Sequence, residues 1–263
     1  MPLVICADDY GLSEGTSAVI RALLEAGEIN ATTCLVETEA WPRASIPLRA
    51  LTQKRSGLAV GLHLNLTESF PHCIDRDAIR PESWWLTRSW FAGAAVRARV
   101  LRSFLAQWEM FAAAIGRAPD FLDGHQYVHL FPPARRALLD LARVKNFKGW
   151  IRQCRTSSAR LIAPRILYDP LSTTLARDAT ASRLATNSGF GGLRSFHRDE
   201  DPIALWRTDL RAMQGNGLLV VHPGADDSPP GSSGIDACRV DEANAFKRGD
   251  MRRLLAELGL SLR

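Results

Sequence analysis

The chain has 263 residues, of which 46% are hydrophobic and 23% are charged. This composition excludes a disordered chain, and the length allows a sizeable core without disulfides or structural zinc. The formal net charge of +5 permits an anionic substrate or a membrane surface, and it does not indicate a nucleic-acid-binding protein. Because the sequence contains no repeat or linker, we expect one domain over residues 1–263.

The N-terminal residues lack the basic and apolar regions of a signal peptide, and no run approaches the roughly 18 apolar residues of a membrane span. The five cysteines are widely spaced and form no CxxC motif, which argues against a disulfide framework or a cysteine zinc site. We therefore expect a reduced, cytoplasmic protein. The sequence leaves the oligomeric state open, and a homodimer is compatible with it.

Short β-rich runs alternate with helical segments along the chain. Strands are expected at residues 3–7, 31–36, 58–62, 121–124, 149–152 and 218–221. Helices are expected at residues 13–26, 41–53, 91–115, from 132 onward, 202–213 and 240–258. Residues 65–90 have an irregular pattern, residues 155–200 have no assignable pattern, and residues 223–235 form a loop. The alternation predicts a parallel sheet, as a doubly wound sheet or a (β/α) barrel.

Four of the expected strands end in reactive side chains, which are Asp8 with Asp9, His63, Asp123 with His125, and His222. Singly, an aspartate pair can cap a helix, and a histidine is more often a structural hydrogen-bonding residue. In parallel α/β folds, however, the carboxyl ends of the strands converge on the ligand site. We therefore expect these residues to share one site. Two imidazoles and one carboxylate would also suit a divalent metal.

Successive residues of a strand point to opposite faces, so Asp8 and Asp9 can share a site only if the strand ends between them. Gly11 favours such a turn. His125 and His129 have the i, i+4 spacing of a helical metal pair. Prolines after residue 131 place the next helix start beyond both, so we expect a loop over residues 125–131. His129 would then support the site or face the substrate.

The remaining histidines, His72 and His197, lie in polar, irregular segments and are expected to be solvated loop residues.

Four motifs stand in a fixed order along the chain: ADDYGLS at 7–13, GLHLNLT at 61–67, DGHQYVH at 123–129 and VHPG at 221–224. In this order and spacing, the chain resembles the YdjC-like carbohydrate deacetylases, which include chitooligosaccharide deacetylase and the hopanoid-associated deacetylase. The segments NSGF at 187–190 and SF at 195–196 are more similar to the hopanoid-associated branch.

The resemblance implies an irregular (β/α) barrel, related to the NodB-type polysaccharide deacetylases, with mainly parallel strands. It implies a hydrolase that removes an N-acetyl group from an amino sugar, in an oligosaccharide or a hopanoid-linked glycoside. The reaction would use a divalent metal, for which Mg, Zn, Mn and Fe remain open. By the same resemblance, the metal ligands are Asp9, His63 and His125, while Asp8 is the general base and His222 the acid.

Arg152 falls where the family tends to carry an arginine, and it would orient the base Asp8. Two positions depart from the family pattern. Tyr10 replaces the usual Phe, and Tyr127 replaces the middle histidine of a His-x-His-x-His pattern. The second change removes the middle imidazole, so Tyr127 is expected to contact the substrate or support the site, and it preserves the ligand His125.

One segment combines Trp84, Trp85, Trp90 and Trp108 with Arg97, Arg99 and Arg102. Aromatic rings can stack on sugars, and a basic aromatic surface can lie against an anionic membrane. A core-packed helix with a solvated basic face would give the same pattern. A peripheral membrane contact therefore stays open beside a soluble N-acetyl amino sugar substrate.

Three other functions are compatible with parts of the pattern. A receiver-type signalling domain also has an acidic pair after its first strand, but it is about half this length and leaves the histidines without a role. A metal-dependent phosphoesterase would use the same two histidines and aspartate. A non-catalytic sugar-binding protein would not require Asp8 beside the ligand set.

Overall fold

The computed structural model describes residues 2–159, 163–194, 200–229 and 235–262. Within these ranges, the strands form one sheet in which every neighbouring pair is parallel, with the order β6-β5-β4-β3-β2-β1-β8-β7. The strands are β1 (Leu3–Tyr10), β2 (Ala31–Cys34), β3 (Ala59–Leu64), β4 (Phe121–Gly124), β5 (Trp150–Ile151), β6 (Ala185–Thr186), β7 (Phe190–Gly191) and β8 (Gly217–Val221).

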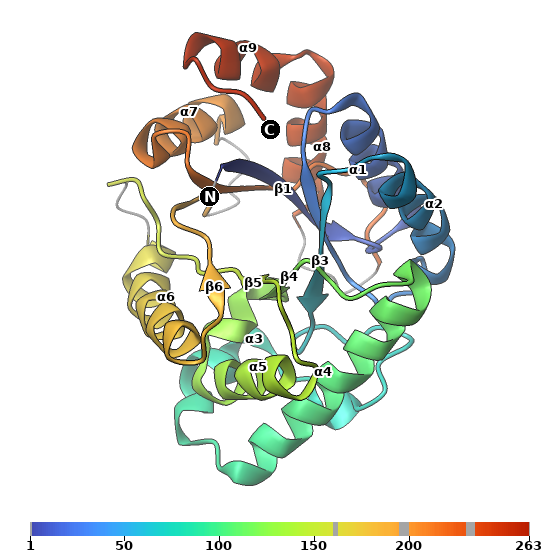
Figure 1. Ribbon diagram of the computed structural model, residues 1–263, viewed down its shortest axis with the longest axis vertical. Coiled ribbons are helices and arrows are strands. Elements are labelled where there is room, and N and C mark those ends of the chain that lie inside the picture. Colours follow the sequence, from blue (N-terminus) through green and yellow to red (C-terminus); the bar gives the residue numbers. More distant parts are fainter. Residues whose placement is uncertain (1, 160–162, 195–199, 230–234, 263) are drawn as a thin grey trace.

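Helices surround the sheet (Figure 1). The α-helices are α1 (Glu14–Ala26), α2 (Trp41–Lys54), α3 (Glu82–Thr87), α4 (Ala94–Ile115), α5 (Pro132–Val144), α6 (Ala163–Ala181), α7 (Pro202–Met213), α8 (Asp236–Lys247) and α9 (Asp250–Glu257). Short 3-10 turns complete the set: η1 (Arg76–Ala78), η2 (Ser89–Phe91) and η3 (His125–Leu130).

The strand order identifies the architecture as an open barrel. Starting at β1, the strands follow one another in chain order to β6 on one side, and β8 and β7 follow on the other side. This is the cyclic order of a (β/α) barrel, whereas a doubly wound sheet reverses direction in its middle. In the described residues no pairing joins β6 to β7, so the barrel is open there. The expected irregular, mainly parallel barrel is confirmed.

Local signals in the sequence correctly marked several element ends. The Ser13 side chain accepts a hydrogen bond from the backbone of Thr16 at the start of α1, and Gly27 ends this helix with a φ of 75°. At α7, Asp201 caps the backbone N–H of Ile203. The side-chain caps and the left-handed glycine are common ways to satisfy the backbone groups at helix ends.

Other boundaries differ from the expectation. The single helix expected at 240–258 is two helices, α8 and α9, because Gly249 takes a left-handed φ of 74° between them. The unassigned segment 155–200 contains α6, β6 and β7, and the irregular segment 65–90 contains η1 and α3. His197, the SF pair at 195–196 and residues 230–234 of the expected loop lie outside the described residues.

The segment rich in Trp and Arg contributes mainly to the core. Trp85 and Trp108 are buried, whereas Trp90 is 49% exposed and Phe91 is 91% exposed. The arginines of α4 are engaged in ion pairs with acidic side chains: Arg97 with Asp140, Arg99 with Asp75 and Asp77, and Arg102 with Asp75. The helix is therefore core-packed with a basic outer face.

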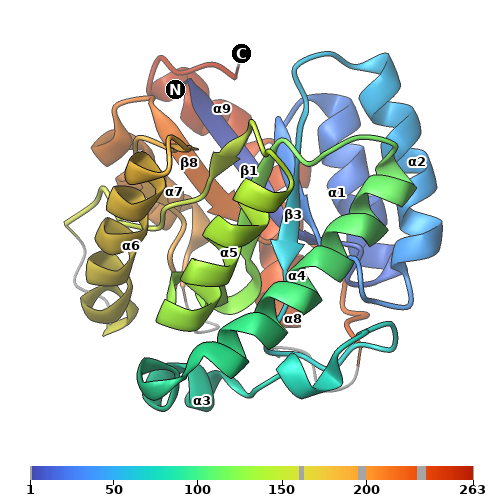
Figure 2. The ribbon, with the colours of Figure 1, turned by 60° about the horizontal axis from the view of Figure 1, so that its bottom comes forward.

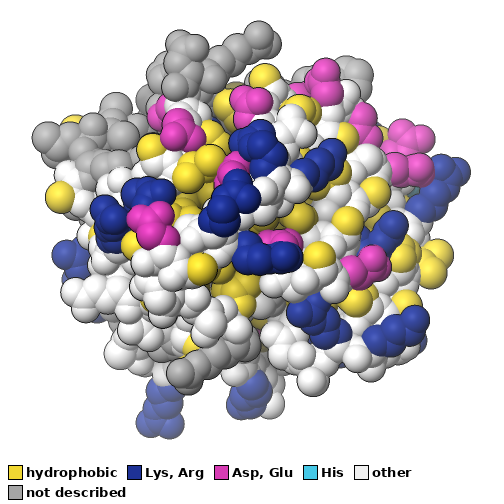
Figure 3. Space-filling model, turned by 90° about the horizontal axis from the view of Figure 1, so that it is seen from above, with side chains coloured by type: hydrophobic (Ala, Val, Ile, Leu, Met, Phe, Trp, Pro, Cys, Tyr) yellow, Lys and Arg dark blue, Asp and Glu magenta, His cyan; other side chains and the backbone are white. Residues whose placement is uncertain are grey.

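Basic side chains are also present elsewhere. Figure 3 shows many Lys and Arg side chains, interspersed with acidic ones, on the face where α9 lies in Figure 1. None of the helices described in the structure combines the length and hydrophobicity that a bilayer-spanning segment needs.

The parallel strands place their carboxyl ends on one side of the molecule. In Figure 2 the arrowhead of β3 points to the lower side, where α3 lies. On β3, Gly61 leaves room for the ring of Phe121, which stacks on Trp150 with 4.3 Å between centroids. A Cβ at Gly61 would lie 2.4 Å from the Phe121 ring. The packing beneath this edge therefore requires glycine at that position.

We expect Gly61→Ala to lower the free energy of unfolding by about 1–3 kcal/mol, because a methyl group overpacks the core. Denaturant unfolding monitored by circular dichroism measures the change. In the double variant with Phe121→Leu the smaller side chain should remove part of the clash, so the two effects should be less than additive. Full additivity would contradict this account.

Candidate metal centre

A pocket of about 320 Å³ opens at the carboxyl ends of the strands. Its wall comes from the ends of β1, β3, β4 and β8, from α3 and α6, and from segments beside β7 and α8. The lining residues are Asp8, Asp9, His63, Glu82, Gly124, His125, Gln126, Tyr127, Tyr168, Leu193, Arg194, His222 and Ile235. The structure thus brings the side chains at the ends of four predicted strands to one pocket.

Both aspartates face this pocket because β1 is irregular at Asp9. The strand does not end between Asp8 and Asp9, as the alternation rule had suggested, but continues to Tyr10. Its pairing with β2 shifts register between Ala7 and Tyr10, and Asp9 has a left-handed φ of 68°. Such irregularities are common next to active sites, where they re-aim a side chain.

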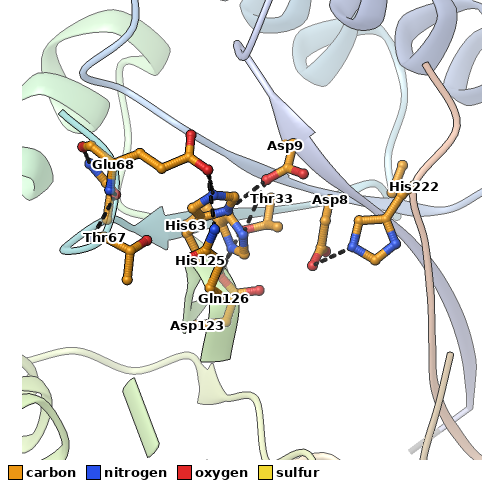
Figure 4. A network of polar contacts seen from close by, with 12 residues as sticks. Asp8, Asp9, Thr33, His63, Thr67, Glu68, Asp123, His125, Gln126 and His222 are labelled. Atoms are coloured by element: carbon orange, nitrogen blue, oxygen red, sulfur yellow. Dashed lines mark hydrogen bonds and ion pairs between the residues drawn. The ribbon is translucent and has the colours of Figure 1, made fainter. Parts of the chain in front are cut away.

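Asp9 and two histidines form a compact buried group (Figure 4). Asp9 Oδ1 lies 3.3 Å from His63 Nε2 and 3.1 Å from His125 Nδ1. In the described part of the chain, this oxygen is buried and has no hydrogen bond of acceptable geometry. One carboxylate oxygen and two imidazole nitrogens, all potential metal ligands, therefore face one another.

The other nitrogen of each imidazole faces a carboxylate. His63 Nδ1 lies 2.7 Å from Asp123 Oδ1, and His125 Nε2 lies 3.1 Å from Glu68 Oε1. Burial alone would lower the pKa of His63, but Asp123 and Asp9 outweigh it and raise this pKa to about 10. In the same way, Asp9 and Glu68 raise the pKa of His125 to about 9 against the effect of burial.

Arg152 connects Asp8 of β1 with Asp123 of β4. Its Nη1 lies 2.7 Å from Asp8 Oδ2, and its Nη2 lies 2.7 Å from both Asp8 Oδ1 and Asp123 Oδ2. The side chain is 1% exposed. Burial raises the pKa of Asp123, yet the nearby Arg152 and His63 more than compensate, so this pKa lies below its usual value. The guanidinium thus holds both oxygens of Asp8.

His222 lies on the far side of Asp8 from the ligand group. Its Nε2 is 4.0 Å from Asp8 Oδ2, and its backbone N–H donates to Glu242 Oε2 over 2.6 Å. Burial lowers the pKa of His222 to about 4, so the ring is neutral at pH 7. Glu242, on α8, also pairs with Arg194 of the pocket wall.

Of the two other predicted site residues, Tyr127 and His129, only Tyr127 lines the pocket. Its ring centroid lies 4.9 Å from that of Tyr168. His129 is fully buried and does not line the pocket, so the structure does not support a substrate-facing position. Instead, its Nε2 lies 3.0 Å from the carbonyl oxygen of Arg152. Burial lowers the pKa of His129 to about 4, so it is a neutral donor that supports Arg152.

Residues 125–130 form the turn η3 rather than an α-helix, because Gln126 and Tyr127 take left-handed φ values of 50° and 57°. This turn separates His125 from His129 and excludes the helical metal pair. His72 is exposed, as expected of a loop residue.

Sequence reasoning missed the partners that come from distant segments. Arg239, on α8, donates from Nη2 to Asp9 Oδ2 over 2.6 Å. Burial raises the pKa of Asp9, but Arg239 and His125 lower it more, to well below its usual value. Glu68 and Glu242 were also missed. Glu68 lies one residue beyond the GLHLNLT motif, which is a weak signal, whereas Arg239 and Glu242 look like ordinary polar residues of a surface helix.

The donor set and the local charge both fit a divalent metal. Two imidazole nitrogens and one carboxylate oxygen are a common ligand set for such ions. The carboxylates of Asp8 and Asp123 pair with the guanidinium of Arg152, that of Asp9 pairs with Arg239, and that of Glu68 lies against His125. Four negative and two positive groups leave two negative charges. One divalent ion would balance them, or else two protons on the histidines.

Comparisons with known proteins agree with the architecture. Chitooligosaccharide deacetylase of Enterobacter sp. (strain 638) is 25% identical over 266 residues, which cover 99% of this chain and 96% of the relative. The enzyme of the same name from Salmonella paratyphi B is 26% identical over 265 residues, which cover 98% and 95%.

Among solved structures, a protein of Enterococcus faecalis V583 named for cellobiose-phosphate cleavage has a TM-score of 0.70 at 20% identity, covering 99% of this chain and 96% of that one. At this identity the likeness concerns the fold alone. The family model described as YdjC-like protein matches residues 2–257, which is nearly the whole sequence. Both the ordered motifs and this match lead to one conclusion: the chain belongs to the YdjC-like protein family.

Proposed function

We propose that this protein is a metal-dependent carbohydrate deacetylase that hydrolyses the N-acetyl amide of an amino sugar. The observation that carries the proposal is a second aspartate, Asp8, which lies beside the three-residue ligand group and is held by Arg152. Curated relatives named chitooligosaccharide deacetylase, which align over 95% or more of their own length, support an N-acetylated sugar as the substrate.

Asp9, His63 and His125 would hold the metal through Oδ1, Nε2 and Nδ1, the atoms that face one another in the buried group. When bound there, a divalent metal supplies Lewis acidity, which lowers the pKa of water and polarises the amide carbonyl. The carboxylates of Asp123 and Glu68 would orient the two rings from behind, as such partners do in other metal sites.

Asp8 would act as the general base. It lines the pocket next to Asp9, and its position is set by two contacts with Arg152. A carboxylate oxygen that accepts one hydrogen bond from a guanidinium can still accept a second from water. Asp8 would therefore receive the proton of the attacking water.

His222 would deliver a proton to the leaving nitrogen. Its imidazole is neutral at pH 7 because burial lowers its pKa to about 4, so the proton has to reach it during turnover. Asp8 Oδ2, 4.0 Å from His222 Nε2, gains a proton in the preceding step and can supply it. Proton transfer by a positioned residue typically contributes about 10²–10⁴-fold.

The charges around the ligand group favour an amide over a phosphate ester. A phosphoesterase needs cationic groups that are available to the transferred phosphoryl group. The two guanidinium groups next to the ligand set, Arg152 and Arg239, are already paired with Asp8, Asp123 and Asp9. The metal-dependent phosphoesterase is therefore the second candidate.

Both an oligosaccharide and a hopanoid-linked glycoside remain open as substrates. The exposed Trp90 and Phe91 would suit contact with a lipid surface, and the ion-paired arginines of α4 would contribute little to it. Membrane contact, a cytoplasmic location and a homodimer stay predictions.

The first test is acetate release from N-acetylglucosamine oligosaccharides after metal removal and re-addition. Activity should vanish without metal and return with it. Asp8→Asn should lower the rate by about 10²–10⁴-fold while metal content stays unchanged, because the amide cannot accept the proton. Full activity of Asp8→Asn would remove the base assignment, and phosphate release without acetate release would favour the phosphoesterase.

The second test concerns the ligands. His63→Ala and His125→Ala should each weaken metal binding by more than the roughly 10–100-fold typical of losing an outer partner, because each variant loses one of three ligands. Elemental analysis of the purified variants measures metal content. His72→Ala is the matched control, since this histidine is exposed. Metal content equal to that of the control would refute the ligand set.

The third test uses the raised histidine pKa values. Because His63 and His125 are protonated at pH 7 without metal, metal binding should release close to two protons. Calorimetric titration in buffers of different ionisation enthalpy counts them. Apparent metal affinity should rise with pH and level off near pH 10. No proton release at pH 7 would contradict the prediction.

The same values predict the stability of the metal-free protein. A histidine whose pKa in the folded protein exceeds its value of about 6.5 in the unfolded chain stabilises the fold fully at pH values below about 6.5. This stabilisation is lost as the pH rises through the pKa of the folded protein. Metal-free protein should therefore lose stability between about pH 7 and pH 10.

A further inference from the structure

One wall of the pocket is built from segments outside the ligand group. Glu82 on α3, Gln126 and Tyr127 on η3, and Tyr168 on α6 line the pocket, and both helices pack against η3. We call these four residues the α3–η3–α6 wall. The proposed hydrolysis assigns a step to none of them. The wall is therefore free to contact the part of the substrate that does not react.

The aromatic part of this wall is fixed in place. Gln126 and Tyr127 both have a left-handed φ, which is uncommon for residues other than glycine and aims both side chains at the pocket. The ring of Tyr127 lies against Tyr168, with 4.9 Å between centroids, and meets Phe190 edge to face at 6.4 Å. Packed tyrosine rings offer an apolar surface together with polar hydroxyl groups. This combination suits a sugar, whose C–H groups and hydroxyls alternate around the ring.

Glu82 supplies the charge of the wall. The other carboxylate and guanidinium groups that line the pocket are each paired with an opposite charge: Asp8 with Arg152, Asp9 with Arg239, and Arg194 with Glu242. Within the described residues Glu82 has no such ion pair, and its side chain is exposed to solvent. Its contact is with the Tyr168 hydroxyl. Burial raises the pKa of Tyr168, and Glu82 raises it further. The Glu82 carboxylate is therefore available to a ligand.

A carboxylate in this position discriminates between sugars by charge. An N-acetyl amino sugar is uncharged and presents hydroxyl groups, and a carboxylate accepts strong, charge-assisted hydrogen bonds from them. Its two oxygens can accept several such bonds, so a contact with Tyr168 leaves capacity for the sugar. A phosphate or carboxylate group on the sugar would instead meet a like charge, which disfavours binding.

We propose that Glu82 determines substrate specificity by accepting hydrogen bonds from hydroxyl groups of an uncharged amino sugar that packs against Tyr127, and by excluding sugars that carry an anionic group at that place. Tyr168 is a positioning residue that holds the Glu82 carboxylate. The inference rests on the proposed function in one respect, which is that an N-acetyl sugar enters this pocket.

Binding to the metal-free protein, followed by ligand-observed NMR, tests the role of Glu82. The probes are the methyl glycoside of N-acetylglucosamine and its monodeoxy analogues, each of which lacks one hydroxyl. In wild type, loss of the hydroxyl that Glu82 holds should weaken binding by about 10–100-fold. In Glu82→Ala the same loss should cost almost nothing, because its partner is absent.

The matched control is Glu39→Ala, which removes an exposed carboxylate outside the pocket and should keep the wild-type pattern. Both substitutions change exposed side chains, so both variants should fold. The proposal fails if the analogues keep the same relative affinities in Glu82→Ala and wild type. It also fails if wild type binds none of the glycosides.

A phosphate ester at the hydroxyl found in this way tests the exclusion of anionic sugars. Wild type should bind the ester at least about tenfold more weakly than the parent glycoside. Glu82→Gln keeps the size of the side chain and removes its charge, so it should recover part of this loss. Equal affinity of wild type and Glu82→Gln for the ester would contradict exclusion by charge.

Tyr168→Phe tests the positioning role, since it keeps the ring and removes the hydroxyl. We expect a smaller preference for the hydroxyl that Glu82 holds, with the other analogues unaffected. A merely structural role would weaken binding of every analogue by the same factor, and that result would remove Tyr168 from the proposal.

These measurements do not depend on acetate release. Hydroxyl-selective binding that requires Glu82, without acetate release by the metal-loaded protein, would reject the deacetylase and keep the sugar subsite. Acetate release combined with unchanged selectivity in Glu82→Ala would reject the subsite alone.

Discussion

Two neighbouring aspartates on a β-strand would normally point to opposite faces of the sheet, and the whole site depends on the backbone that breaks this alternation. The left-handed φ of Asp9 and the register shift in β1 bring Asp8 and Asp9 into one pocket. A non-glycine residue in this region costs on the order of 1–3 kcal/mol and persists only where surrounding contacts impose it. Here Arg239 and Arg152 supply such contacts, one to each aspartate.

The second constraint is electrostatic. Asp8, Asp9 and Asp123 are nearly completely buried, and buried carboxylates are tolerated only when paired. The pairs are assembled from elements that are distant in the chain, with Arg152 after β5 and Arg239 on α8. Removing one partner of a buried pair typically costs about 3–5 kcal/mol, because the other charge remains. The same ion pairs therefore stabilise the barrel and decide which oxygens face the pocket.

Much of the fold could be predicted from local patterns. Hydrophobic runs located β1, β2, β3, β4 and β8, and a serine cap with a glycine stop bounded α1 correctly. The pattern had no signal for β6 and β7, which are two residues long and are defined only by their neighbours in the sheet. The break between α8 and α9 depends on one glycine within a continuous helical pattern, and such a glycine need not end a helix.

Part of the site could also be predicted, for a different reason. The candidates Asp8, His63, His125 and His222 lie at or next to strand ends, and parallel topology brings such ends together whatever the details of packing. Their chemical roles rest on family resemblance and on the proposed mechanism. His129 shows the limit of this reasoning, since it is near the site in sequence but lies behind Arg152 rather than in the pocket.

By itself, the sequence determined the order of strands and helices, the residues at the strand ends and the family motifs, because these depend on hydrophobic periodicity and on side chains within a few residues of one another. Only the tertiary structure decided which oxygens are free and which are paired. Asp9 and its partner Arg239 are 230 residues apart, and no local pattern encodes such a contact. Because Asp9 is buried, its carboxylate needs a nearby counter-charge, and the fold supplies one in Arg239.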